Sequence, residues 1–354
     1  MARPRSATST DVARLAGVSQ ATVSVVLNGA RSTIRVSAET RQRVLAAAAE
    51  LGYSPHPAAQ ALRRQRSGII GFLPRIDRDA PFTHPIHYLL SIHANRAARE
   101  RGFQFVEAGP ETDPWRDSAE DELVRYFLNH RADGVIFDGP KSAGAVQRLL
   151  DHGLPVVQIF RPQWSVPTPT VTVDARPGIT AAVDHLVTLG HRRIAFVGRA
   201  GNHPVDLARL TAFLTALANH GLPATAATVR LSPIYELDQG ERLTRELLAQ
   251  RTRPTAIFAG SDSLALGASR ALYAARVHVP DELSLISYDD TFAVQLYPPL
   301  TSVAQPFAAL AERAVALLIA QIEQLDGPPL PPEQVVLPTQ LNLRQSTAPP
   351  MRAG

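Results

Sequence analysis

Short apolar runs alternate with helical stretches along most of the chain after residue 68. Short β-branched strands that alternate with helices favour parallel sheets with helices on both faces. A first series of predicted strands covers 68–73, 103–108, 134–137, 155–159 and 170–174, and a second covers 193–198, 255–258 and 283–287. The predicted helices lie near 86–101, 117–130, 142–152, 177–190, 206–220, 238–250 and 262–275. Two successive series predict an α/β body of two doubly wound parallel-sheet lobes, whose ligands bind beyond the carboxyl ends of the strands.

The first 66 residues have another pattern, in which short helices are separated by glycine and serine. Thr10 is predicted to cap a helix that Gly17 ends, and Ser19 to cap a second helix over residues 20–28. Ser37 would cap a third helix from Ala38 to Leu51, with one apolar face formed by Val44, Leu45, Ala48 and Leu51. A glycine turn between two short helices is typical of a helix-turn-helix.

Charge is distributed unevenly along the chain. Residues 1–66 hold ten arginines against three acidic residues, a net charge of +7, while the remainder has a net charge of −3, which together give the total of +4. A basic head on a mildly acidic body is expected when one end of a protein meets a polyanion.

Composition excludes several classes of protein. The 354 residues are 45% hydrophobic and include no cysteine, which excludes a disulfide scaffold, a cysteine nucleophile and a thiolate metal site. The longest apolar runs are shorter than the roughly 18 residues that suggest a membrane helix. Asp11 and Arg14 precede any long apolar run, so we expect no signal peptide and a cytoplasmic protein without membrane partners.

Enzymatic motifs do not stand out either. The chain contains no GxGxxG, P-loop, GxSxG or HExxH pattern, so we expect no enzyme and no cofactor. His84, His87 and His93 have irregular spacing and include Pro85 between them, which disfavours a metal site. A periplasmic solute-binding protein would share the two-lobed body but would need a signal peptide and would lack the basic head. A non-specific DNA-binding protein would not need a body of this size.

The segments DVARLAGVSQATVSVVLNG and VSAETRQRVLAAAAELGYSPHPAAQALRR resemble the DNA-binding head of the lactose-repressor (LacI/GalR) family of bacterial transcription regulators. The resemblance continues through HLVTLGHRRIAFVG, PTAIFAGSDSLALGASRAL, VPDELSLISYDD, PPLTSVAQP and LPTQLNLRQST. It implies a helix-turn-helix head, a hinge helix and a periplasmic-binding-protein-like body whose lobes are joined by crossovers near 161, 290 and 320. The corresponding domains are 1–54, 55–67 and 68–345, followed by a C-terminal tail at 346–354.

The resemblance also implies a mechanism at operator DNA. A homodimer that acts as a repressor would bind a palindromic operator with its second helix in the major groove. Gln20 can pair with adenine and Ala21 can touch a thymine methyl, while Val25 cannot hydrogen-bond guanine. Leu62 matches the leucine that wedges into the minor groove. The predicted DNA-binding residues are Thr10, Ser19, Gln20, Ala21, Thr22, Ser24, Val25, Asn28, Arg31, Arg35, Ala59, Leu62 and Arg63.

A small-molecule effector would bind between the lobes. The resemblance assigns it Arg161, Asp174, Arg209, Ser261 and Asp289, and an aromatic wall is expected from Phe72, Phe82, Phe160, Trp164 and Phe292. Guanidinium and carboxylate groups can each bind vicinal hydroxyls, which favours a sugar or a sugar derivative. Ser261 stands where relatives commonly have asparagine, and Phe160 where several have aspartate, so a less uniformly polar ligand such as a nucleobase stays open.

Overall fold

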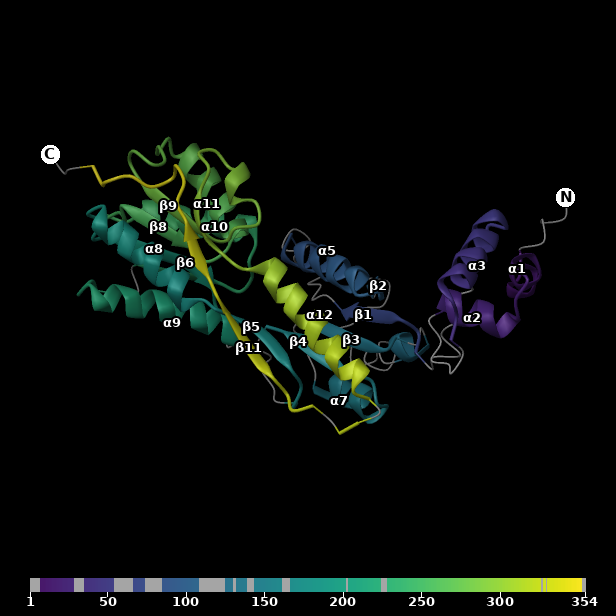
Figure 1. Cartoon of the computed structure of the whole chain (residues 1–354). Coiled ribbons are helices and arrows are strands. Elements are labelled where there is room, and N and C mark those ends of the chain that lie inside the picture. The colour runs from purple at the N-terminus through teal and green to yellow at the C-terminus, as the bar shows by residue number, and fades with distance from the viewer. Residues whose placement is uncertain are drawn as a thin grey trace. The chain divides into compact units, whose positions relative to one another are not determined.

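The computed structural model describes residues 7–28, 35–53, 66–73, 85–107, 125–129, 132–138, 143–160, 166–201, 203–223, 228–325, 327–328 and 330–351. Contacts divide the chain into two units, Met1–Gly68 and Ile69–Gly354. Figure 1 labels the elements of both units. None of the described helices is long and apolar enough to span a membrane.

The first unit is a bundle of short helices, α1 (Ser9–Ala16), α2 (Gln20–Asn28) and α3 (Ala38–Glu50). Small and β-branched side chains let these helices approach closely, and burial of their apolar surface stabilises the bundle. Its core contains Val12, Ala13, Ala16, Val23, Val26, Val44, Ala47 and Ala48. The predicted helix-turn-helix arrangement is confirmed.

The helix caps of this unit differ from the prediction at one position. The cap of α1 is Thr8 rather than Thr10: its hydroxyl accepts a bond from the amide of Asp11, whose carboxylate accepts in return from the Thr8 backbone. The predicted role of Thr10 as a cap is therefore wrong, because this reciprocal pair begins the helix two residues earlier. Gly17 ends α1 with φ of 65°, and Ser37 caps α3, as predicted. Leu45 is 50% exposed and does not belong to the apolar face.

The first lobe of the second unit has a six-stranded parallel sheet in the order β11-β5-β4-β3-β1-β2. Its strands are β1 (Ile69–Leu73), β2 (Gln104–Glu107), β3 (Gly134–Asp138), β4 (Val156–Ile159), β5 (Thr170–Asp174) and β11 (Gln334–Pro338). Side chains alternate across the sheet: Ile136 packs with α5 (Pro85–Glu100) and α12 (Phe307–Glu323), whereas Val135 and Phe137 pack with α7 (Ala143–Asp151). Both faces are thus covered by helices.

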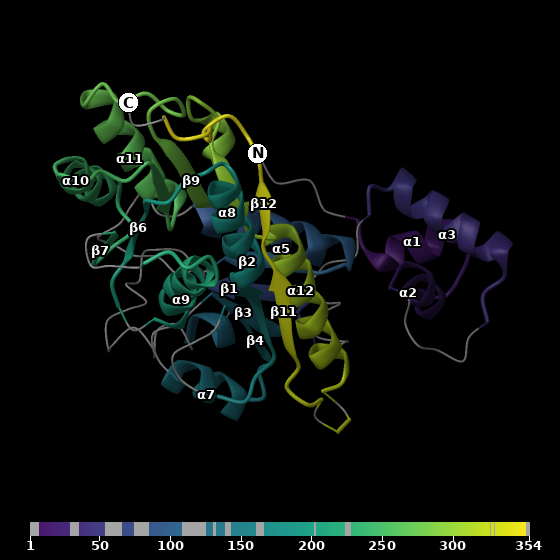
Figure 2. The same cartoon turned by 90° about the vertical axis from the view of Figure 1, so that its left-hand side faces the viewer.

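The second lobe repeats this design in the order β12-β10-β9-β8-β6-β7, with only the β10–β12 pair antiparallel. Its strands are β6 (Ile194–Arg199), β7 (Val229–Ser232), β8 (Ala256–Ala259), β9 (Ser284–Asp289), β10 (Thr301–Ala304) and β12 (Gln340–Asn342). One face packs against α8 (Arg176–Thr188) and α9 (Pro204–Asn219), the other against α10 (Leu237–Leu248) and α11 (Asp262–Ala274). Figure 2 shows α9, α10 and β7 around this lobe. The predicted class of two doubly wound lobes is confirmed.

The crossovers between the lobes lie later in the chain than the resemblance implied. The chain leaves the first sheet after β5 and enters the second lobe at Ala175, returns between β10 and α12 at Gln305, and passes again between β11 and β12 at Thr339. The positions near 161, 290 and 320 are therefore wrong, because β5 and β10 still belong to the sheets that precede each crossover. The Thr339 hydroxyl donates to the Asp174 carbonyl at 3.0 Å and accepts from the Gly178 amide at 3.0 Å, which ties two crossovers together.

The C-terminal segment is part of the second lobe. Ser346 is fully buried, accepts from the Thr301 amide at 2.8 Å and donates to the Leu285 carbonyl. The carbonyl of Ala348 lies 2.9 Å from Nε2 of buried His191. Ser346 and Ala348, which the sequence assigns to a C-terminal tail, therefore complete the packing of β9 and β10.

Candidate functional site

Of the eight predicted DNA-binding side chains that the structure describes, five lie at the surface of the first unit. Thr10, Ser19, Gln20, Ala21 and Arg35 are exposed, and Thr22, Ser24 and Val25 are half-buried. Ser19 accepts from the amide of Thr22 at 3.2 Å, so α2 begins with a capped turn whose exposed residues are polar or small. Exposed polar groups at the start of the second helix are what a major-groove reader needs.

Gln20 is held in place within this unit. Its Nε2 donates to Oγ of Ser9 at 2.8 Å, so the side chain is bonded to α1. A base contact by Gln20 would use its remaining donor and its carbonyl oxygen. The side chains of Asn28, Arg31, Ala59, Leu62 and Arg63 lie outside the described residues.

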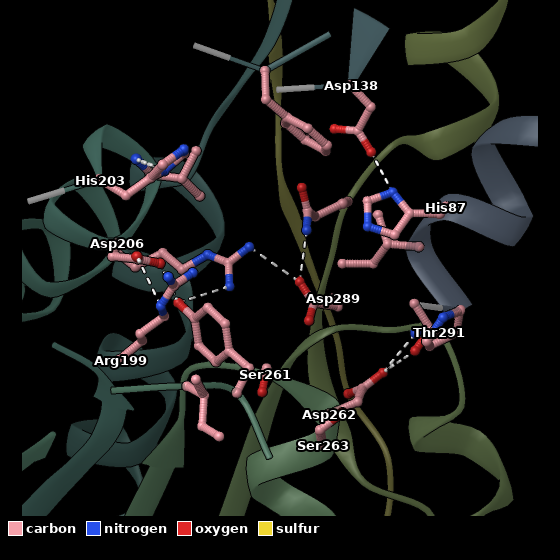
Figure 3. Close-up of a pocket in the computed structure, with 18 of the residues that line it drawn as sticks. His87, Asp138, Arg199, His203, Asp206, Ser261, Asp262, Ser263, Asp289 and Thr291 are labelled. Atoms are coloured by element: carbon pink, nitrogen blue, oxygen red, sulfur yellow. Dashed lines mark hydrogen bonds and ion pairs between the residues drawn. The ribbon is translucent and has the colours of Figure 1, made fainter. Parts of the chain in front are cut away.

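A pocket lies between the two lobes of the second unit. Most of its lining residues stand at or just beyond the carboxyl ends of strands, where doubly wound sheets bind ligands. The first lobe contributes Pro85, Ile86, His87, Asp138 and Phe160. The second lobe contributes Arg199, His203, Val205, Asp206, Arg209, Ile234, Tyr235, Ser261, Asp262, Ser263, Asp289, Thr291, Phe292 and Gln305. We call this the inter-lobe pocket. Figure 3 shows His203, Asp206 and Arg199 on one side of it and His87 with Asp138 on the other.

Arg209 is the centre of a buried polar network on the second lobe. Its guanidinium donates to Oδ1 of Asp289 at 3.2 Å and to the Gly260 carbonyl at 2.8 Å, and it lies 4.0 Å from the centre of the Tyr288 ring. Burial alone would lower the pKa of Arg209, but Tyr235 and Asp289 raise it, so the group stays charged. A buried cation over an aromatic face and beside a carboxylate is stabilised by both.

The carboxylates of this network have different partners. Tyr235 donates to Oδ1 of Asp206 at 2.6 Å, and Gln305 donates to Oδ1 of Asp289 at 2.6 Å. Asp262 accepts through Oδ2 from the Thr291 amide at 2.6 Å, while its buried Oδ1 has no hydrogen-bond partner among the described residues. Burial raises the pKa of Asp262. The pocket thus offers acceptors, and a ligand with several donors would satisfy them.

Two residues that line the pocket have left-handed backbone conformations. Phe160 has φ of 64° and Asp289 has φ of 99°, values that cost free energy for residues other than glycine. Asp290 also has a positive φ of 60°, but its carboxylate pairs with Arg344 at 2.6 Å. The two neighbouring carboxylates therefore have separate partners and do not form an acid–base pair.

The pKa of Asp289 leads to a prediction about pH. Burial raises it to about 7, with Arg209 opposing and Asp262 reinforcing the shift. Between about pH 4 and pH 7 the unfolded chain loses this proton while the folded protein keeps it, so the group destabilises the fold as pH rises. As the pH rises from about 4 to about 7, the unfolding free energy of the wild type should therefore fall by a few kcal/mol relative to that of Asp289→Asn. Above about pH 7 the difference between the two proteins should stay nearly constant.

Denaturant unfolding at a series of pH values would measure this difference. Asp281→Asn is the matched control. Because Asp281 is exposed, the difference in unfolding free energy between this variant and the wild type should not change with pH. Parallel stability curves for wild type and Asp289→Asn would contradict the prediction.

The first lobe adds a second polar pair and an aromatic ring. His87, in the first turn of α5, turns its Nδ1 to the carboxylate of Asp138 at the end of β3, which is 2% exposed. Phe160 follows β4 and can cover the apolar face of a ring. No cluster of three histidine or acidic side chains that could hold a metal ion occurs in the part of the chain that the structure describes.

The structure brings together five of the ten residues expected around the effector, namely Phe160, Arg209, Ser261, Asp289 and Phe292. Ser261 uses its hydroxyl to cap α11. Phe72 is wrong as a cleft residue, because its ring points from β1 into the core against Phe105 at 5.6 Å. Asp174 does not line the pocket, and its carboxylate pairs with Arg176 at 2.7 Å. Phe82, Arg161 and Trp164 lie outside the described residues.

The sequence alone does not reveal several polar residues of the pocket. They are His87, Asp138, Arg199, His203, Asp206, Tyr235, Asp262 and Gln305. Asp138 and Arg199 each end a strand whose apolar run had been recognised, so the carboxyl-end rule could have identified them. Gln305 follows β10, a strand that the sequence did not reveal.

Comparison with known protein families gives one match for each unit. The model of bacterial regulatory proteins of the lacI family matches residues 8–56. The model of the periplasmic binding protein-like domain matches residues 183–347. The first match covers the three helices of the head, and the second covers most of the second lobe together with α12.

Similar proteins match along nearly the whole chain. The HTH-type transcriptional regulator DegA of Bacillus subtilis is 31% identical, over 96% of this chain and 97% of its own length. A solved complex of the transcriptional regulator CelR with cellobiose is 31% identical, with a TM-score of 0.69, and covers 97% of this chain and all of its own. The lac repressor dimer bound to operator and an anti-inducer is 26% identical, with a TM-score of 0.74 over 97% of this chain and all of its own. The chain belongs to the lacI family of bacterial regulatory proteins and is a DNA-binding regulator of transcription.

Proposed function

We propose that this regulator is a cytoplasmic repressor that binds a palindromic operator as a homodimer and responds to a carbohydrate or sugar derivative in the inter-lobe pocket. The observation that carries the effector assignment is the buried Arg209–Asp289 pair, with further carboxylates at Asp206 and Asp262 around the same space. Charged donors and acceptors fixed in a buried pocket suit the many hydroxyls of a sugar. The cellobiose complex of CelR supports the same class of ligand.

Aromatic side chains narrow the expected ligand. Phe160 and Phe292 line the pocket from the two lobes, and Tyr235 adds a third ring. Apolar ring faces of a sugar can pack against such side chains while its hydroxyls meet the polar network. We therefore expect a pyranose or a glycoside rather than an open-chain polyol.

DNA binding in this proposal uses the head and the segment that follows it. Gln20 and Ala21 face base edges in the major groove, and Leu62 opens a base step in the minor groove. Effector binding changes the closure of the two lobes and hence the spacing of the paired hinge segments. Such coupling requires that the effector bind the two closure states with different affinities.

Thermal unfolding with a panel of sugars, glycosides, sugar phosphates and purines tests the effector assignment. A sugar at about a hundred times its dissociation constant should stabilise the protein by roughly 2.7 kcal/mol. We expect this stabilisation to be lost in Asp289→Asn and kept in Asp281→Asn, whose carboxylate is outside the pocket. If only purines raise the unfolding temperature, or if no compound of the panel does, the carbohydrate assignment is overturned. Neither outcome would affect the DNA-binding function.

A further inference from the structure

A second cavity lies at the opposite end of the second lobe from the inter-lobe pocket. It is lined by residues at the amino ends of β6 and β7 and by the segments that follow α9 and α10, whereas the inter-lobe pocket contains residues at the carboxyl ends of the same strands. Figure 2 shows these four elements together on one side of the lobe. With 3.3 Å per residue, the six residues of β6 separate the two sites by roughly 15–20 Å.

This cavity has an apolar floor and a basic rim. Its volume is about 530 Å³. Ile194, Leu217 and Leu247 form the floor and are at most 3% exposed. The rim carries four arginines, and no acidic residue lines the described part of the cavity. We call this cavity the arginine pocket. It is defined by the three floor residues together with Arg192, Arg193, Arg230 and Arg251. The neighbouring residues 224–227 are Ala-Thr-Ala-Ala and add no charge.

Three of these arginines lack a carboxylate partner among the described residues. Arg192 donates to the carbonyls of Val187 and His191, and Arg193 donates through Nε to the carbonyl of Arg253 at 2.9 Å. Neutral carbonyls leave the positive charges uncompensated. Arg251 is exposed and has no hydrogen bond or ion pair to another described residue.

Other arginines of the same unit behave differently. Arg242 and Arg245 on α10 pair with Glu246 and Glu241, and Arg313 pairs with Glu333 at 2.7 Å. In the arginine pocket only Arg230 has such a partner, with its Nε 3.6 Å from Oε2 of Glu246. Arginine near helix C-termini also interacts favourably with the helix dipole, but that role requires no cavity beside it.

We propose that the arginine pocket is a second ligand site, which binds an organic phosphate with an apolar body. Guanidinium groups bind phosphate oxygens through paired hydrogen bonds. A phosphate dianion that lies between the arginines also reduces the repulsion between their positive charges. The leucine and isoleucine floor gives an aryl or alkyl group a place to bury its surface. The site is separate from the effector pocket and does not depend on what the effector is.

Calorimetric titration of the full-length protein with 1-naphthyl phosphate tests this site. We expect saturable binding that weakens at least tenfold in Arg193→Gln/Arg251→Gln, since each charged hydrogen bond is worth about 1.5–3 kcal/mol. The matched control is Arg245→Gln/Arg270→Gln, which removes the same charge from α10 and α11 outside the pocket, where both arginines pair with Glu241, and should change binding less than about twofold.

Two further variants test whether binding depends on the charge of the arginine pocket alone. Thr252→Asp places a carboxylate in the lining without removing an arginine, and it should weaken binding in the same direction. Asp289→Asn changes the inter-lobe pocket and should leave 1-naphthyl phosphate binding unchanged. Absence of saturable binding to the wild type, or equal losses in the pocket and control variants, would overturn the proposal.

Discussion

Arg209→Met should lower the free energy of unfolding by about 3–5 kcal/mol at about pH 8 and abolish stabilisation by the effector. Both side chains of the Arg209–Asp289 pair are only 6% exposed, so removing the cation leaves a buried carboxylate without its counter-charge. The loss should shrink below about pH 7, where Asp289 can take up a proton. Denaturant unfolding at the two pH values measures both effects.

A double-mutant cycle separates this pair from ordinary packing. Arg209→Met/Asp289→Asn removes both charges and should recover a large part of the stability lost in the single variant. Arg313→Met is the surface control, because the Arg313–Glu333 pair is about half exposed and should contribute at most about 1 kcal/mol. Equal losses in Arg209→Met and the double variant would contradict the assigned ion pair.

Gly267→Ala should destabilise the second lobe by about 1–3 kcal/mol or more, although alanine is the better helix former. At Gly267 in α11 an added Cβ would overlap the carbonyl oxygen of Leu237 and lie 2.6 Å from the amide nitrogen of Glu241. Both atoms are backbone, so α10 and α11 would have to separate. Because Ser261 and Asp262 stand at the start of α11, the shift should also weaken effector binding.

Thermal unfolding of Gly267→Ala beside Ser269→Ala tests this close approach. Ser269 lies on the same helix, is half-buried and donates its hydroxyl to the Ala265 carbonyl at 3.0 Å, so its replacement should change stability by at most about 0.5 kcal/mol. An increase in stability for Gly267→Ala would mean that the two helices are not held in contact there.

The sequence predicted the strands whose apolar pattern is strong and missed four others, β7, β10, β11 and β12. The recognised strands are confirmed to within two residues, as for β4 and β6. β10 was missed because Thr301 and Ser302 are polar, yet both are fully buried, and Ser302 bonds to Ser287 at 2.8 Å. Without β10 the following helix α12 and the second crossover could not be placed.

The sequence predicts only some of the residues that line the inter-lobe pocket. The end of a strand shows which residues lie near the pocket, but not the direction in which each side chain points. Arg209 and Asp289 line the pocket as the resemblance implied. Phe72 and Asp174 belong to strands of the correct sheet, yet one side chain faces the core and the other faces Arg176. Successive residues of a strand point to opposite faces, so a shift of one residue decides between pocket and core.

The dependence of operator binding on the effector is the most direct test of the account. The full-length protein would first select a palindromic sequence from random DNA, and its affinity for that sequence would then be measured by fluorescence anisotropy at one salt concentration. We predict that saturating sugar changes operator affinity by roughly 5–150-fold and that operator DNA changes sugar affinity by the same factor. Equal operator affinity with and without a sugar that occupies the inter-lobe pocket would contradict a ligand-responsive regulator.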